Sequence, residues 1–258
     1  MRRARRPARR GLVAILGSLA IAAATLGAAG CGSADDPADD AATVFAASSL
    51  TEAFRAIDPD PAFSFAGSDQ LAFQVEQGAP ADVFASASPK YADALHAKGL
   101  VLAPRVFATN RVVVIVPTAN PAGIRRVGDL ADPGVKLVIG EPDVPIGAYT
   151  RTALARLGLS AALANVVSQE HDVKSIVAKV ALGEADAGLA YLTDVRPAEG
   201  RVASIPIPAR AQPVVEYAVA VVRSTRHRAE ADAFVDRLLG EPGRAVLARL
   251  GFGLPRPR

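Results

Sequence analysis

From Thr43 onward, short apolar runs alternate with segments of helical periodicity, and this alternation constrains the fold more than any other feature of the sequence. After the apolar run 43–47, Leu50, Ala53, Phe54 and Ile57 recur at the spacing of one helix face. Strands are predicted at 43–47, 63–66, 82–85, 111–116, 135–139, 187–191 and 214–222. Alternating strands and helices predict an α/β protein with largely parallel sheets, which bind ligands at the carboxyl ends of their strands.

Proline and glycine mark the predicted ends of several helices. Pro89 follows Ser88 at the start of one helix, which is the preferred place for proline in a first turn. Glycines at 78, 99 and 158 are expected to end three helices. Further helices are predicted at Ala148–Leu157, Val173–Val180, Ala229–Leu239 and Pro242–Leu250.

The first thirty residues predict an export signal. Six arginines stand among the first ten residues, and the segment 11–30 is uncharged and ends in small residues. Cys31 is the only cysteine of the chain, so internal disulfides are excluded, and its position after Ala28-Ala29-Gly30 resembles a lipoprotein cleavage site and predicts lipidation. An uncleaved membrane helix is the alternative, because twenty uncharged residues can span a bilayer. Arg9-Arg10 leaves both the general and the twin-arginine export routes open.

The residues after the cysteine predict an acidic tether. Segment 31–42 is small, acidic and without large apolar side chains, so the globular part is expected to begin near Thr43. The formal net charge of +3 comes from the N-terminal arginines, since residues 31–258 hold 23 basic and 26 acidic side chains. A mildly acidic body lacks the basic footprint of a nucleic-acid-binding protein, and no nucleic acid is expected as a partner.

No catalytic or metal-binding motif is found in the sequence. It lacks the G-x-S-x-G elbow, the phosphate loop, H-E-x-x-H and the dinucleotide fingerprint. The histidines at 96, 171 and 227 do not have metal-ligand spacing. We therefore predict no enzyme, no cofactor and no structural metal. His171-Asp172 leaves one alternative open, in which a base activates Ser49 or Ser68 in a secreted hydrolase.

Two serines stand where an apolar strand passes into a helix. Ser49 and Ser68 each open a helix, whose first N–H groups lack internal partners and carry the positive end of the helix dipole. Taken singly, each serine is better explained as an ordinary helix cap. Two such helix starts converging on one cleft would bind an anion without any positive side chain.

An ordered set of motifs across residues 43–253 resembles the molybdate-binding protein of the bacterial molybdate ABC importer. The most specific motif is Gly-Ala-Pro-Ala-Asp-Val-Phe at 78–84. The motifs are Val44–Leu50, Phe65–Leu71, Gln77–Ala87, Glu141–Tyr149, Asp172-Val173, Gly188–Asp194 and Gly251-Phe252.

The resemblance implies an oxyanion held by two serine hydroxyls, two further backbone amides and a tyrosine hydroxyl. The matching positions are Ser49, Ser68, the N–H of Ile146, the N–H of Val173 and Tyr191. Tyr191 has an alternative role as a core aromatic whose hydroxyl binds a backbone acceptor. Asp69 departs from the family, where a neutral residue is common at this position. The departure matters because a carboxylate repels a dianion. Either Asp69 faces solvent and complements the helix dipole, or it accepts the proton of a ligand such as hydrogen phosphate.

The resemblance also implies the two-lobe, type II architecture of periplasmic binding proteins, with the ligand between lobes joined by two crossover strands. With crossings at Val112–Val116 and Val214–Val222, residues 43–116 and 214–258 form lobe 1 and residues 117–213 form lobe 2.

The function that follows is a monomeric receptor, lipid-anchored at the outer face of the cytoplasmic membrane or periplasmic. It would capture molybdate, and also tungstate, deliver it to an ABC permease with its ATPase, and catalyse no reaction. A receptor for sulfate or phosphate is the alternative within this class, and the hydrolase is the alternative outside it.

Overall fold

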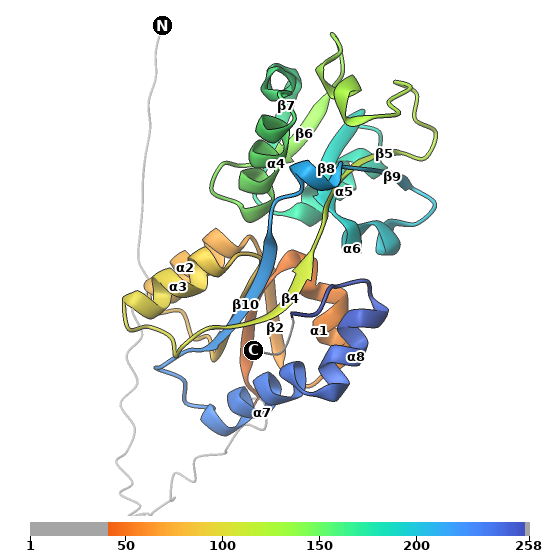
Figure 1. The fold of residues 1–258 in the computed structure, drawn as a ribbon. Coiled ribbons are helices and arrows are strands. Elements are labelled where there is room, and N and C mark those ends of the chain that lie inside the picture. Colours follow the sequence, from red (N-terminus) through yellow and green to blue (C-terminus); the bar gives the residue numbers. More distant parts are fainter. Residues whose placement is uncertain (1–40, 256–258) are drawn as a thin grey trace, which may run out of the picture. The chain divides into compact units, whose positions relative to one another are not determined.

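The structure is a computed structural model that describes residues 41–255. The predicted export signal, Cys31 and all but the last two residues of the predicted tether lie outside the described residues. The described part is an α/β protein with two five-stranded sheets, each flanked by helices (Figure 1). Within residues 41–255, no helix has the length and apolarity that a membrane crossing requires.

The first sheet has the strand order β2-β1-β3-β10-β4. Its strands are β1 (Thr43–Ala47), β2 (Ala62–Ala66), β3 (Val83–Ser86), β4 (Arg105–Asn110) and β10 (Val215–Val221). Strand β1 pairs in parallel with β2 and β3, whereas β10 pairs antiparallel with β3 and β4. On one face lie α2 (Ser68–Glu76) and α3 (Pro89–Ala97), and on the other α1 (Thr51–Ile57), α7 (Arg228–Leu239) and α8 (Glu241–Arg249) (Figure 1).

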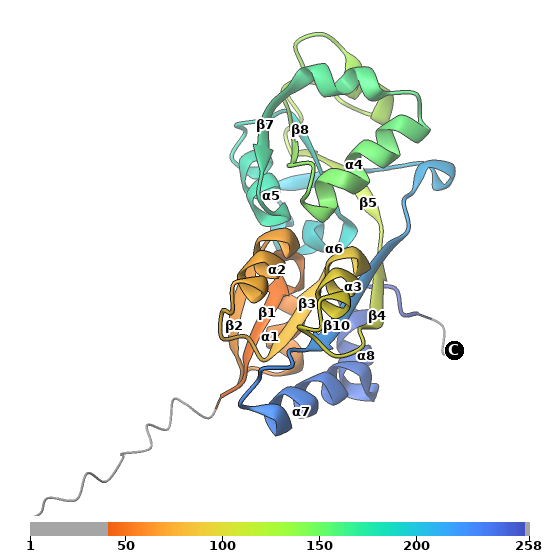
Figure 2. The same cartoon turned by 90° about the vertical axis from the view of Figure 1, so that its left-hand side faces the viewer.

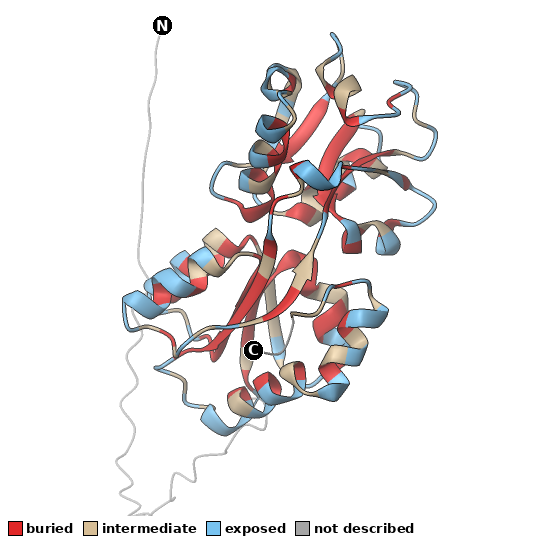
Figure 3. Ribbon diagram, in the orientation of Figure 1, coloured by how far each residue is buried: buried red, intermediate tan, exposed pale blue. Residues whose placement is uncertain are grey.

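Alternating residues of β1 explain why this sheet is covered on both faces. Phe45 packs with Leu71 and Leu95 of α2 and α3, whereas its neighbours Val44 and Ala46 belong to the core on the opposite face. Successive side chains of a strand point to opposite faces, so a strand buried on both reads as a continuous apolar run. Figure 3 shows the strands buried and the outer helix faces exposed.

The second sheet has the order β7-β6-β8-β5-β9. Its strands are β5 (Val112–Pro117), β6 (Leu137–Gly140), β7 (Val166–Glu170), β8 (Ala187–Tyr191) and β9 (Val202–Pro206). Strand β6 pairs in parallel with β7 and β8, and β5 pairs antiparallel with β8 and β9. Helices α4 (Pro145–Arg156) and α5 (Val173–Ala181) lie on either side of it (Figure 2), and α6 (Leu192–Val195) follows β8. Five 3-10 helices complete the described elements: η1 (Ser48–Leu50), η2 (Val127–Ala131), η3 (Ser160–Asn165), η4 (Arg196–Ala198) and η5 (Ala209–Ala211).

The predicted helix ends are confirmed, but the sheets are less parallel than predicted. Helices α2, α3 and α4 each end two residues before Gly78, Gly99 and Gly158, which have positive φ. In each sheet, two of the four strand pairings are antiparallel. Strands β4, β7 and β9 were not predicted, because each lies at a sheet edge and contains polar residues.

The chain crosses between the sheets twice. Strand β4 ends at Asn110 in the first sheet and β5 begins at Val112 in the second, so the first crossing falls at Arg111. The return crossing lies between β9 and β10. The run 112–116, predicted as a crossing strand of lobe 1, is an interior strand of the second sheet, where its valines are buried on both faces. We define lobe 1 as residues 41–110 and 215–255, and lobe 2 as residues 112–206.

Candidate functional site

A small cavity lies between the lobes, at the carboxyl ends of β1, β2 and β8. Its volume is about 10 Å³, far below the range of roughly 300–1,000 Å³ typical of sites for drug-sized molecules. All five predicted oxyanion ligands contribute to its wall. The lining residues are Ala47, Ser48, Ser49, Ala66, Gly67, Ser68, Ala87, Val144, Pro145, Ile146, Asp172, Val173 and Tyr191.

Four helix N-termini meet at this cavity. Two come from lobe 1, where Ser48 begins the turn that leads into α1 and Ser68 begins α2. The other two come from lobe 2, where α4 begins at Pro145 and α5 at Val173. Because each helix follows a strand of the sheet, the free N–H groups and positive dipole ends of all four converge on one small space.

Ser49 and Ser68 each have a hydroxyl oxygen that already accepts or shares a hydrogen bond. The N–H of Ala87 donates to Ser68 Oγ at 3.0 Å, which leaves the Ser68 proton for another acceptor. Ser49 Oγ lies 3.1 Å from the hydroxyl of Tyr217 in β10. Ser49 and Ser68 are both buried, so a ligand in the cavity would be the partner of any hydroxyl proton directed there.

The first N–H groups of α4 and α5 are available to a ligand. Pro145 has no N–H, so Ile146 carries the first one of α4. Val144, the residue before the helix, has no side-chain acceptor for it. In α5, Oδ1 of Asp172 accepts the N–H groups of Lys174 and Ser175 at 2.7 and 3.1 Å and leaves that of Val173. The other oxygen of Asp172 accepts from the Ser175 hydroxyl at 2.9 Å, so both carboxylate oxygens bind their own helix.

The hydroxyl of Tyr191 is the unpartnered polar group of the cavity wall. Tyr191 ends β8 and is 1% exposed, and among the described residues its hydroxyl has no hydrogen-bond partner. The backbone acceptor that a core tyrosine would use is therefore not present there. Burial raises the pKa of Tyr191 well above its usual value, so the hydroxyl keeps its proton. Leaving such a group unpaired costs roughly 1–3 kcal/mol, which an acceptor atom of a ligand would offset.

All four tyrosines of the chain lie where the lobes meet. The hydroxyl of Tyr91 in lobe 1 donates to the carbonyl of Asp143 in lobe 2. In the reverse direction, Tyr149 of lobe 2 donates to the carbonyl of Ala87 in lobe 1 at 3.3 Å. The rings of Tyr191 and Tyr217, one from each lobe, are 5.9 Å apart in an edge-to-face arrangement. These contacts close the lobes over the cavity.

The backbones of the two lobes approach each other closely at Gly67. A Cβ on this residue would lie 2.2 Å from the carbonyl oxygen of His171. Only glycine therefore allows the loop before α2 to meet the loop before α5 at this distance. The ring of His171 points to Glu141, with 2.9 Å between Nδ1 and Oε2, and the hydroxyls of Ser49 and Ser68 have other partners. The structure thus does not bring His171 together with either serine.

Asp69 lies beside the cavity but not on its wall, so neither role considered from the sequence describes it fully. It is partly covered rather than solvent-facing, because the loop of lobe 2 that carries Glu141 and Asp143 faces it. Its Oδ1 is buried and has no hydrogen-bond partner among the described residues. Burial raises the pKa of Asp69, and the neighbouring carboxylates of Glu141 and Asp143 raise it further.

Two residues behind Ser49 were missed by sequence reasoning. Tyr217 is fully buried in β10 and contacts Ser49, and the Nδ2 atom of Asn110 lies 3.2 Å from the Tyr217 hydroxyl. A tyrosine within a buried apolar strand is the signal that could have revealed this contact, because a buried hydroxyl requires a partner. Nothing local identifies which partner, since Ser49 is 168 residues away in the chain.

The two-lobed fold with a small cavity between the lobes defines a solute-binding protein. Residues 29–253 match the family model described as bacterial extracellular solute-binding protein. The molybdate-binding protein ModA of Mycobacterium tuberculosis is 39% identical over 222 residues, covering 82% of this chain and 84% of that protein. ModA of Escherichia coli is 34% identical over 226 residues, covering 81% and 88%. The chain belongs to the ModA family of molybdate-binding proteins.

A solved structure shares the fold. The periplasmic molybdate-binding protein of Azotobacter vinelandii aligns with a TM-score of 0.73, covering 83% of this chain and all of that one, at 24% sequence identity. This likeness supports the two-lobed type II architecture.

Proposed function

We propose that this protein is an extracytoplasmic receptor that captures molybdate in the cavity between its lobes. The observation that carries the proposal is the chemistry of the wall, which presents the hydroxyls of Ser49, Ser68 and Tyr191 and the N–H groups at Ile146 and Val173. A fully deprotonated tetrahedral dianion offers only acceptors, so such donors can satisfy it completely. The names of the matched relatives support molybdate as this dianion.

The same chemistry ranks the competing anions. Tungstate has the charge and shape of molybdate and is expected to bind as well. Sulfate is smaller, so several donors would be out of its reach. Hydrogen phosphate brings a proton that needs an acceptor, and the one carboxylate on the wall, that of Asp172, already accepts three hydrogen bonds.

Ligand binding and lobe closure form one event in this proposal. Ser49 and Ser68 belong to lobe 1, whereas Ile146, Val173 and Tyr191 belong to lobe 2. The full set of donors therefore exists only when the lobes meet, and the anion stabilises the closed form.

Anchoring and delivery complete the proposed role. A lipid on Cys31 would hold a monomeric receptor at the outer face of the cytoplasmic membrane, from which it passes the anion to an ABC permease driven by its ATPase. The small residues before Cys31 and the uncharged segment preceding them support this part. Mass spectrometry of the membrane fraction tests it: we expect a mature N-terminus at a lipid-modified Cys31, and an unmodified thiol would contradict it.

No reaction is part of the proposal. A nucleophilic serine needs an adjacent base, whereas Ser49 contacts Tyr217 and Ser68 contacts the N–H of Ala87. A fluorophosphonate probe is expected to leave both serines unlabelled. Stoichiometric labelling of either would favour the hydrolase instead.

Calorimetric titration of the purified protein with molybdate, tungstate, sulfate and phosphate tests the central proposal. We expect the first two to bind far more tightly than the others. Charge-assisted hydrogen bonds contribute roughly 1.5–3 kcal/mol each, so Ser49→Ala, Ser68→Ala and Tyr191→Phe should each weaken molybdate by roughly ten- to a hundredfold. A wild type that prefers phosphate would overturn the assignment.

A further inference from the structure

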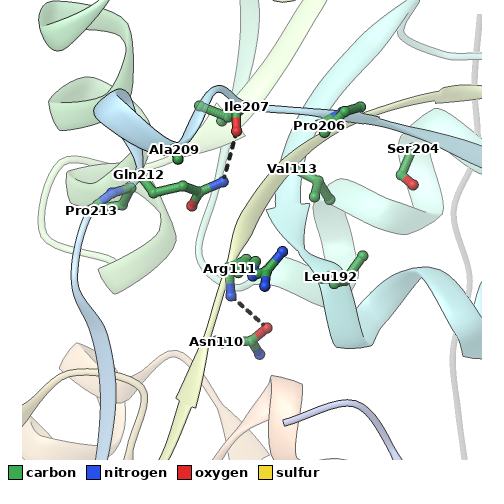
Figure 4. Close-up of a pocket in the computed structure, with 10 residues that line it drawn as sticks. All are labelled: Asn110, Arg111, Val113, Leu192, Ser204, Pro206, Ile207, Ala209, Gln212 and Pro213. Carbon is green, nitrogen blue, oxygen red and sulfur yellow. Dashed lines mark hydrogen bonds between the residues drawn. The ribbon is translucent and has the colours of Figure 1, made fainter. Parts of the chain in front are cut away.

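A chain of three hydrogen-bonding groups ends at the Ser49 hydroxyl. Asn110 ends β4 beside the first crossing, and its Oδ1 accepts the N–H of Arg111 at 2.9 Å (Figure 4). This contact orients the amide, so that Nδ2 faces the Tyr217 hydroxyl at 3.2 Å and Oγ1 of Thr193 at 2.9 Å. The Tyr217 hydroxyl in turn lies 3.1 Å from Ser49 Oγ.

The amide of Asn110 determines which hydroxyl donates and which accepts in the other hydrogen bonds of the series. An amide nitrogen can only donate, so the Tyr217 oxygen accepts from Asn110. The proton of Tyr217 is then directed to Ser49 Oγ, which is the other group within hydrogen-bond distance of it. Burial raises the pKa of Tyr217, so this proton is retained. Ser49 Oγ becomes an acceptor from Tyr217, and the proton of Ser49 remains for the cavity.

We propose that Asn110 and Tyr217 are positioning residues that make Ser49 a hydrogen-bond donor toward the ligand and so favour oxyanions that carry no proton. This inference rests on the proposed function and deepens it. Ser68 is made a donor toward the cavity in the same way by the main chain, because the N–H of Ala87 can only donate to its oxygen. At Ser49 the direction of the hydrogen bond depends on side chains, and a single substitution can reverse it.

The substitution Asn110→Asp reverses the donor-to-acceptor direction of these hydrogen bonds. An ionised carboxylate only accepts, so Tyr217 would donate to the introduced carboxylate and its oxygen would accept the Ser49 proton. Ser49 would then present a lone pair to the cavity. At pH 8, molybdate and hydrogen phosphate are both dianions, so the added negative charge acts on both and its effect cancels in the ratio of their dissociation constants.

Competition titrations with molybdate and hydrogen phosphate at pH 8 test the proposal. For Asn110→Asp we expect molybdate to weaken by at least a hundredfold and the preference for molybdate over hydrogen phosphate to fall at least tenfold. Asn110→Leu removes the donor to Tyr217 without supplying an acceptor, so the direction of the Tyr217 proton is no longer fixed but is not reversed, and the preference should fall by less than in Asn110→Asp. Equal weakening of both anions in Asn110→Asp would overturn the proposal.

A double-mutant cycle separates positioning from a structural effect. Tyr217→Phe should weaken molybdate by three- to tenfold in the wild type and have no further effect in Ser49→Ala, because it acts through that hydroxyl. The same weakening in both backgrounds would overturn the inference. A wild type that binds neither molybdate nor tungstate would instead overturn the proposed function. The two failures are therefore distinct.

Discussion

Lys174 joins the two lobes through Glu52, with its Nζ 2.8 Å from each carboxylate oxygen of that residue. Lys174 directly follows Val173, whose N–H lines the cavity, and Glu52 lies in α1 of lobe 1. Within lobe 2, Nζ also lies 3.4 Å from Oδ1 of the buried Asp194. Opening of the lobes would break the contact with Glu52 and retain the one with Asp194. The Lys174–Glu52 ion pair therefore stabilises only the closed form.

Glu52→Gln is therefore expected to weaken ligand binding without affecting the unliganded fold. Both side chains are partly exposed, and such pairs contribute about 0.2–1 kcal/mol, or up to about fivefold in affinity. The loss of affinity should appear as faster ligand dissociation, measured by stopped flow. Lys90→Gln is the matched control, because Lys90 also pairs across the lobes, but at 3.9 Å and largely in solvent. Equal effects of the two variants would contradict a specific role for Lys174.

Gly67→Ala is expected to block closure while leaving lobe 1 intact. The backbone of Gly67 has φ −63° and ψ 140°, which alanine adopts easily. The added methyl group would lie 2.2 Å from the His171 carbonyl oxygen of lobe 2, which is backbone, and 2.8 Å from Oδ1 of Asp69, a side-chain atom that can rotate away. We expect molybdate binding to fall more than a hundredfold with the melting temperature of the unliganded protein unchanged. Binding at wild-type affinity would show that the lobes do not meet at this residue when the ligand is bound.

Asp69→Asn is expected to leave molybdate binding unchanged or to tighten it a few-fold at pH 8. The wild-type carboxylate approaches Glu141 and Asp143 when the lobes close, and burial with these neighbours raises its pKa. Ionised Asp69 therefore opposes closure, and the opposition fades as the pH falls through its raised pKa. The affinity ratio of variant to wild type should accordingly be largest at high pH. A large loss of binding in this variant would place Asp69 among the ligand contacts.

Asp194 is expected to make the protein less stable as the pH rises. Burial raises its pKa from 3.8 to about 7, despite the nearby Lys174. Between pH 4 and pH 7 the folded state therefore binds more protons than the unfolded state, and the free energy of unfolding falls with rising pH. Asp194→Asn stays neutral, so its stability relative to wild type should increase over this range, by roughly 4 kcal/mol at most.

Asp82 supplies a control of opposite sign for that experiment. Burial disfavours its charge, but hydrogen bonds from Thr225, the N–H of Thr43 and His227 outweigh burial and lower its pKa. Its contribution is present above pH 4 and is lost as the pH falls through its lowered pKa. Asp82→Asn should thus be less stable than wild type at neutral pH and approach it in acid. Urea unfolding of the three proteins from pH 2 to pH 8 measures both trends, because the Asp82 contribution is lost below pH 4. Curves that stay parallel over this whole range would contradict them.

The helix starts at the site were predictable because their signals are local. Ser68 opens α2, and the predicted start at Ser49 lies within the turn that leads into α1. The start of α4 was predicted three residues late, although Pro145 is a strong signal for a first turn. The roles of Ile146 and Val173 came from resemblance rather than from spacing, because an N–H donor leaves no trace in residue type. The role of Tyr191 also came from resemblance, because a core aromatic would have the same sequence context.

What could not be predicted depends on pairing between distant segments. The first crossing at Arg111 follows from the pairing of β4 with β10 and of β5 with β8, and neither partner is evident from the apolar run itself. Asp69 reads as a surface residue until the loop at 141–143 is placed against it. Register and closure decide these features, and both are set by the assembled lobes.

The four tyrosines at the meeting of the lobes give the protein an optical property of its own. The chain contains no tryptophan, so its tyrosine-band absorption and emission, at longer wavelengths than those of phenylalanine, arise from Tyr91, Tyr149, Tyr191 and Tyr217. Two of their hydroxyls bind carbonyls of the opposite lobe and a third faces the cavity. Because every tyrosine lies where the lobes meet, we expect the tyrosine emission of the unlabelled protein to change as the lobes open and close, so that closure can be followed in real time without a dye or an engineered fluorophore.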